Sequence, residues 1–72
     1  MVAIRVNLRA ELKARGMTSR QLAARIGITE VNLSRLATGK ARSIRFGTLE
    51  AICRELRCKP GDILDYIDEG AA

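Results

Sequence analysis

The 72-residue sequence has no histidine and no tryptophan, and its only aromatic side chains are Phe46 and Tyr66. No plausible pair of nucleophile and base stands out, so we do not expect an enzyme. Sites that stack the bases of single-stranded nucleic acid need several aromatic rings, which makes that class of site improbable here. The sequence also gives no indication of a cofactor or a small-molecule ligand.

Cysteine and long apolar runs are scarce as well. Cys53 and Cys58 lie five residues apart on or near one predicted helix, a poor geometry for a disulfide. Two thiols without histidine do not make a zinc site, and we expect Cys53 to be a small buried apolar residue. No signal peptide is recognisable, and no apolar stretch approaches the ~20 residues of a membrane span. We therefore expect a cytoplasmic chain with no metal and no membrane partner.

Acidic residues are rare in the first part of the chain. Residues 1–46 hold ten Lys or Arg and two Asp or Glu, a balance of +8, whereas residues 47–72 hold three and six, a balance of −3. Such asymmetry indicates a polyanionic partner for the first part, although arginine-rich helices can also serve solubility alone. Ten of the thirteen cations are arginine, whose fork of donors suits phosphate.

The stretch from Thr18 to Leu36 has the pattern of two short helices joined by a tight turn. Thr18 and Gln21 predict a capping box at the start of the first helix. Gly27 predicts its end, because glycine adopts the left-handed conformation without a Cβ penalty, and Thr29 predicts the next N-cap. The apolar stripe comprises Leu22, Ala23, Ile26, Leu33 and Leu36. This spacing favours a helix-turn-helix over residues 18–37; an ordinary helical hairpin is the alternative.

The flanking segments predict the rest of a single domain over residues 1–72. Residues 2–6 alternate like a short strand, which we expect to pair with residues 43–46 or, alternatively, with another subunit. Asn7 predicts the cap of a first helix from Leu8 to about Arg15. Further helices are expected over residues 45–57, with Phe46 on their apolar face, and from Pro60 to about Tyr66, followed by a frayed tail at 68–72.

Several longer runs make a family resemblance visible. They are the Ala23, Gly27 and Leu33 spacing, the segments LSRLATGKA, TLEAICREL and CKPGDIL, and the IRVNL start with its GKARSIRF loop. Over roughly residues 7–67 the chain resembles the lambdoid-repressor and Cro-like helix-turn-helix proteins of the XRE family. The resemblance implies an all-α, five-helix lambda-repressor-like DNA-binding domain whose third helix enters the major groove.

The resemblance also implies a set of site residues. Ser19 and Thr29 fall where the family contacts the DNA backbone. The predicted base-reading residues are Glu30, Val31, Ser34 and Arg35, and the predicted loop contacts to the backbone are Thr38, Lys40, Arg42 and Arg45. Helical spacing supports the first group independently, because turning Leu33 and Leu36 inward turns these four outward.

Arg35 is the strongest candidate for a base contact, since arginine can bind guanine bidentately. The alternative is a solvated arginine, or one paired with Glu30. The sequence departs from the family at Glu30 and Val31, where many relatives carry glutamine or other polar residues. These features predict a homodimeric regulator of transcription, most simply a repressor, that binds double-stranded DNA. The alternative is a protein-interaction module of the same fold, such as an antitoxin-like partner.

Overall fold

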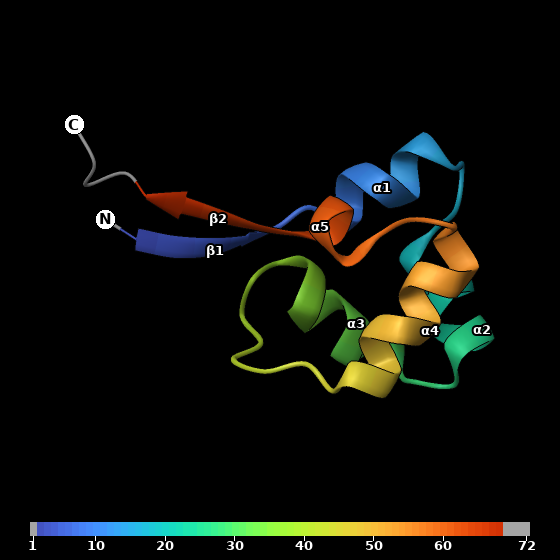
Figure 1. Ribbon diagram of the computed structural model, residues 1–72. Helices are drawn as coiled ribbons and strands as arrows, with labels where there is room; N and C mark the ends of the chain where they lie inside the picture. Colours follow the sequence, from blue (N-terminus) through green and yellow to red (C-terminus); the bar gives the residue numbers. More distant parts are fainter. Residues whose placement is uncertain (1, 69–72) are drawn as a thin grey trace.

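The structure is a computed structural model that describes residues 2–68 (Figure 1). A helical body carries a two-stranded ribbon that projects from it, so the longest axis measures 41 Å against 22 and 19 Å for the others. The elements in chain order are β1 (Val2–Val6), α1 (Leu8–Ala14), α2 (Ser19–Ile26), α3 (Glu30–Ala37), α4 (Phe46–Leu56), α5 (Pro60–Ile63) and β2 (Leu64–Asp68). None of the helices in the described residues is long and apolar enough to span a bilayer.

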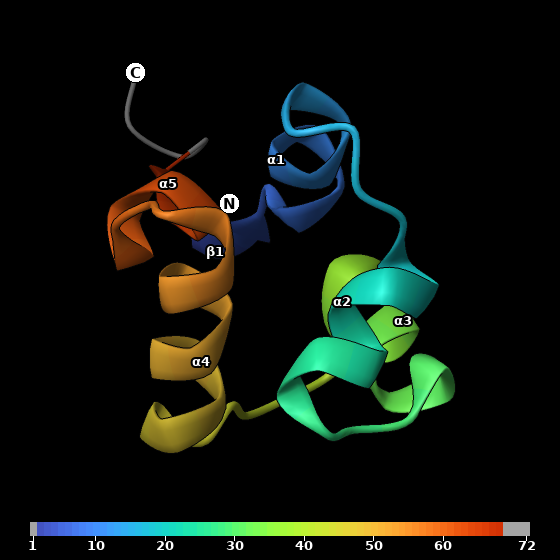
Figure 2. The same ribbon diagram turned by 90° about the vertical axis from the view of Figure 1, so that its right-hand side faces the viewer.

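Every helix contributes to one small core. The large side chains that are fully buried are Leu8 of α1, Leu22 of α2, Leu33 of α3, Ile52 and Leu56 of α4, and Ile63 of α5. Each buried aliphatic side chain of this size contributes roughly 1.5–3 kcal/mol, so the core holds the helices at fixed angles. Figure 2 shows α2 and α3 together on one side, with α4 standing beside them.

The predicted helix boundaries hold for most of the body. α1 and α4 have the expected core segments, with Arg15, Arg45 and Arg57 serving as caps rather than helical residues. Asn7 occupies the N-cap of α1, but its side chain makes no capping hydrogen bond. Cys53 is half-buried against the core rather than fully buried, and it is a free thiol, as is Cys58.

The predicted partner of the N-terminal strand is wrong. β1 pairs antiparallel with β2, in a register that places Ile4 opposite Tyr66 and Val6 opposite Leu64, instead of pairing with residues 43–46. Residues 43–45 connect the preceding loop to α4, whose first residue is Phe46. This segment therefore leads into a helix and does not form a strand. The ribbon leaves Ile4 exposed.

The predicted final helix is too long. α5 ends at Ile63, and the backbone is already extended at Leu64, where φ is −118° and ψ is 133°. Asp68, assigned to the frayed tail, is the last residue of β2, and residues 69–72 lie outside the described part. Phe46 is 87% exposed and does not belong to the buried face of α4. Over residues 2–68 the fold is therefore five helices with a small antiparallel sheet, and the strictly all-α prediction needs this correction.

Candidate nucleic-acid interface

Local hydrogen bonds fix both ends of α2, the helix that precedes α3. Thr18 and Gln21 form the predicted capping box: Gln21 N–H donates to Thr18 Oγ1 at 3.1 Å, and Thr18 N–H donates to Gln21 Oε1 at 3.0 Å. Gly27 ends α2 in the left-handed conformation at φ 76°, and its N–H donates to the carbonyl of Ala23 at 3.0 Å. Ala23 is buried, which allows the two helices to approach closely.

The start of α3 is equally well defined. Thr29 is its N-cap, and Thr29 Oγ1 accepts a hydrogen bond from the N–H of Asn32 at 3.1 Å. Leu33, Leu36 and Ala37 are buried on the inner side of the helix. Because residues three or four apart share a helix face, the remaining positions point away from the body.

Those outward positions line one shallow hollow beside the end of the helix. Its lining consists of Ser19 from α2, Glu30, Val31, Ser34 and Arg35 from α3, and Thr38 and Lys40 from the following loop. All four predicted base-reading residues and three of the predicted backbone contacts are thus gathered in one place. Val31 is 69% exposed, and Arg35 is exposed as well.

The Arg35 guanidinium has no hydrogen bond or ion pair within residues 2–68, so the alternative of a pair with Glu30 is not realised here. An exposed guanidinium without an internal partner keeps all its donors for an external acceptor. Lys40 is exposed at the same hollow. Two cations and one carboxylate, Glu30, therefore set the charge of this surface.

Hydroxyl orientation distinguishes the two predicted threonine contacts. Thr38 Oγ1 donates to the carbonyl of Ser34 at 2.9 Å, so its proton is used within the helix end. Thr29 Oγ1 instead accepts from Asn32, which leaves its own proton available for a phosphate oxygen. Thr29 is the better placed donor of the two.

The loop after α3 offers side chains rather than main-chain donors. The N–H groups of Lys40 and Ala41 both donate to the carbonyl of Arg35, at 2.9 and 3.1 Å, and Gly39 N–H donates to Leu36. The main-chain N–H groups of these three residues therefore already have acceptors within the protein. Any phosphate contact here depends on the Lys40 ammonium and its neighbours.

Of the six predicted backbone contacts, Thr29, Arg42 and Arg45 do not line this hollow, and the last two line other hollows. Arg45 lines a second hollow between α3 and α4, together with Asn32 and Ser43. Arg42 lines a third hollow, beside β1. Asn32 is an exposed residue of α3 for which we predicted no contact, and its spacing of four from Leu36 on the same helix is the signal that would have placed it on this flank.

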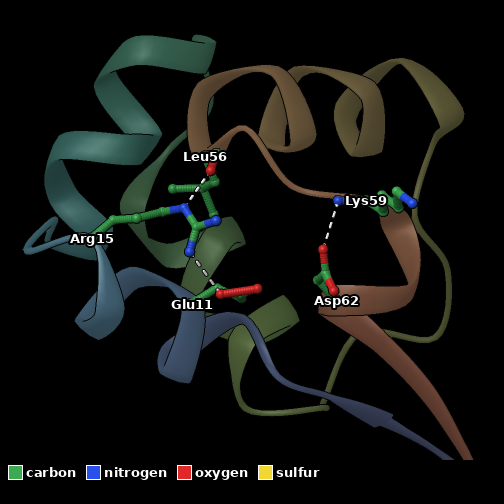
Figure 3. A network of polar contacts seen from close by, with 5 residues as sticks. All are labelled: Glu11, Arg15, Leu56, Lys59 and Asp62. Atoms are coloured by element: carbon green, nitrogen blue, oxygen red, sulfur yellow. Dashed lines mark hydrogen bonds and ion pairs between the residues drawn. The ribbon is translucent and has the colours of Figure 1, made fainter.

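A grouping of possible metal ligands lies at the α1–α5 end of the molecule. Ligand atoms of Glu11, Cys58 and Asp62 lie within 4.8 Å of one another. Figure 3 shows that the carboxylates already have partners: Glu11 pairs with the guanidinium of Arg15 at 2.8 Å, and Asp62 accepts the N–H of Lys59 at 2.9 Å. The neighbouring guanidinium opposes a second cation, so we assign no metal to this group.

Comparisons with known proteins agree with this geometry. The model of the Cro/C1-type HTH DNA-binding domain matches residues 7–69. An uncharacterized HTH-type transcriptional regulator, YozG of Bacillus subtilis (strain 168), is 52% identical over 65 residues, covering 90% of this chain and 77% of its own. The crystal structure of the transcriptional regulator VanUg (Form II) superposes with a TM-score of 0.74 at 28% identity, covering 94% of this chain and 89% of that chain.

These matches confirm the XRE-like resemblance and exclude an enzyme, because the family is one of DNA-binding transcriptional regulators. The match to the family model spans nearly the whole described chain, including α2, α3 and the hollow beside them. The chain therefore belongs to the Cro/C1-type helix-turn-helix DNA-binding domain family.

Proposed function

We propose that this protein is a transcriptional repressor that binds a specific duplex site as a homodimer, with α3 in the major groove. The observation that carries the proposal is the gathering of Ser34, Arg35 and Lys40 with four other predicted contact residues around one exposed hollow. A protein seated over a promoter denies that duplex to other proteins, which is why we favour repression. Because bacterial DNA lies in the cytoplasm, we place the protein there.

Base reading falls to the outward residues of α3. Arg35 binds guanine through O6 and N7, a bidentate contact that provides about 1–3 kcal/mol of discrimination. Val31 meets a thymine methyl group, and Glu30 accepts from the amino group of a cytosine, the one base-edge partner that suits a carboxylate in the major groove. The proposed half-site therefore contains a G·C pair under Arg35.

Phosphate contacts set the register but carry no base preference. Ser19 and Thr29 donate through their hydroxyl groups, and Lys40 donates through its ammonium group. Arg42 and Arg45 extend the positive surface along the backbone on the flanks. Two such modules on one face of the duplex place their half-sites about 34 Å apart, one helical turn.

The test is a pair of alanine variants measured against a site selected from a random duplex pool. Arg35→Ala should reduce affinity for the selected site about 10-fold or more and relax preference at a single base pair. Lys40→Ala should weaken all duplexes alike and reduce the slope of log K against log salt by about 1. Duplex binding by the wild type that is absent, or insensitive to salt, would falsify the proposal.

One observation favours a second candidate function. Val31 is an apolar residue that is 69% exposed and lines the hollow, and it is next to Glu30, whose charge opposes phosphate. An apolar side chain next to a carboxylate also suits a protein partner that presents an apolar side chain and a cation. A stoichiometric protein complex that Val31→Ser abolishes, with no duplex binding at low salt, would select this interaction module over the repressor.

A further inference from the structure

Two hydrogen bonds show which main-chain groups of the ribbon point inward, toward the paired strand, and which point outward. Asn7 N–H donates to the carbonyl of Ile63 at 2.6 Å, at the base of the ribbon. In an antiparallel ladder, hydrogen-bonded and non-hydrogen-bonded pairs alternate, so the pairs Arg5–Asp65 and Ala3–Ile67 direct their main-chain groups inward. Tyr66 N–H donates instead to its neighbour Asp65 Oδ1 at 2.8 Å, as an outward-directed group would.

The residues between these hydrogen-bonded pairs have the opposite orientation, so their main-chain groups point outward. Ile4 and Val6 of β1 direct their N–H and carbonyl groups toward the free edge of that strand. Within residues 2–68, no main-chain hydrogen bond from the 39–45 loop reaches either residue. β1 therefore presents an open edge, the kind of surface that pairs readily with another strand.

The two edges of the ribbon differ in charge. β2 has the sequence LDYID, so two copies paired through β2 would bring four aspartates together, and the Tyr66 N–H is already occupied. β1 has the sequence VAIRV, with Arg5 as its single charge. Repulsion disfavours the β2 edge and leaves the β1 edge as the one suited to self-pairing.

Exposed apolar side chains accompany the open edge. Ile4 and Tyr66 are directly opposite one another and are 64% and 57% exposed. Ile4 also lines an apolar hollow together with Val6 and Leu64. This hollow continues to Ala41 and Ile44 of the loop. Pairing at the β1 edge would bring the Ile4 side chains of two copies together on this face.

We infer that β1 pairs antiparallel with β1 of a second copy about a two-fold axis at Ile4, giving a four-stranded sheet. Ile4 and Ile4 of the partner subunit then exchange both main-chain hydrogen bonds, and Arg5 lies opposite Ala3 of the partner subunit, which keeps the two guanidinium groups apart. An isolated two-stranded ribbon is marginal, whereas four strands with an apolar face are stable. This inference rests on the proposed homodimer and names its surface.

The test compares Ile4→Pro with Phe46→Ser by sedimentation equilibrium. Proline at position 4 removes an outward N–H and the Ile4 side chain but keeps the β1–β2 ladder, because that ladder uses the groups of Ala3 and Arg5, and edge strands tolerate such prolines. Phe46→Ser removes a large apolar side chain that is 87% exposed at the start of α4, outside the ribbon. Losing two symmetry-related hydrogen bonds should raise the dimer dissociation constant about 30-fold in Ile4→Pro, whereas Phe46→Ser should stay at the wild-type value.

Amide hydrogen exchange in the wild type supplies a second measurement that needs no variant. In the dimer, the amides of Ile4 and Val6 should be as protected as those of Ala3 and Arg5. Dilution to monomer should release Ile4 and Val6 while Ala3 and Arg5 stay protected. An Ile4 amide that exchanges freely in a dimeric sample, or a dimer lost through Phe46→Ser, overturns the inference and leaves the proposed DNA binding intact. A wild type that binds its duplex only as a monomer overturns both the interface and the homodimer.

Discussion

Arg15, the cap of α1, donates a hydrogen bond from Nε to the carbonyl oxygen of Leu56, the last residue of α4 and 41 positions further along the chain. The same guanidinium pairs with Glu11 one turn back in α1 (Figure 3). The last carbonyls of a helix have no partner within it, so this side chain satisfies one of them and joins two helix ends. α4 packs on α2, and the bond thus supports the frame that positions α3.

Replacing Arg15 by methionine should therefore destabilise the fold by about 1–2 kcal/mol, since a charged donor to a main-chain carbonyl is lost. Glu11→Gln should cost only about 0.5 kcal/mol, because it removes an exposed i,i+4 ion pair and keeps the bond to Leu56. Urea denaturation measures both, with Arg9→Met on the exposed face of α1 as the control. Equal losses in the Arg15 and Glu11 variants would mean that the Leu56 bond contributes nothing.

The capping box at Thr18 predicts a second stability effect. Thr18→Ala removes the acceptor for Gln21 N–H and should lower the free energy of unfolding by about 1 kcal/mol. Thr18→Ser is the matched control, because it keeps the hydroxyl and should stay within about 0.3 kcal/mol of the wild type. If both variants melt at the same temperature, the cap is not what stabilises the start of α2.

Sequence reasoning succeeded where structure depends on local chemistry. The helix ends at Thr18, Gly27 and Thr29 follow from hydroxyl acceptors and one left-handed residue, and neighbours within four positions decide them. The outward direction of Arg35 follows from burial of Leu33 and Leu36 on the same helix. These features need no knowledge of distant segments.

The errors concern contacts between distant segments. Ile63, Leu64 and Ile67 fit a helical stripe, yet Leu64 and Tyr66 also alternate with Asp65 as a strand does. The presence of β1 alongside decides between the two, and local pattern cannot show which segment will lie there. The separation of Arg42 and Arg45 from the hollow likewise depends on the path of the loop.

Two glycines predict opposite responses to the same substitution. Gly27 has φ 76°, so Gly27→Ala places a Cβ in the left-handed region and should destabilise the protein by about 1–2 kcal/mol. Gly47 lies in the first turn of α4, without positive φ and with no heavy atom within 4 Å of an added Cβ. Gly47→Ala should stabilise the protein by about 0.5–1 kcal/mol.

Thermal unfolding of the two glycine variants, followed by circular dichroism, checks the signs directly. A shift of the same sign in both would show that backbone conformation does not govern either position. Gly27→Asn is a useful intermediate, because asparagine tolerates the left-handed region better than alanine and should recover part of the loss.

The thiol of Cys58 predicts a dependence of stability on pH. Burial, followed by the neighbouring Cys53 and Glu11, raises the pKa of Cys58 above its ordinary value of 9.0. The folded protein thus retains a proton that the unfolded chain releases, so this contribution to stability is fully present below the unfolded pKa and is lost as the pH rises through the folded pKa. Cys58→Ala should unfold in urea with a smaller loss of stability between pH 8 and pH 10 than the wild type.

Alkylation gives an independent readout of the same thiol, because the thiolate is the reactive form. At pH 9, iodoacetamide should modify Cys58 more slowly in the folded protein than in the urea-unfolded chain, as followed by mass spectrometry of the peptide that contains it. The difference should narrow as the pH rises through the folded pKa, since both states then hold the thiolate; slow modification that persists at high pH would instead point to restricted access. Equal rates at pH 9 would show that the folded environment does not favour the protonated thiol.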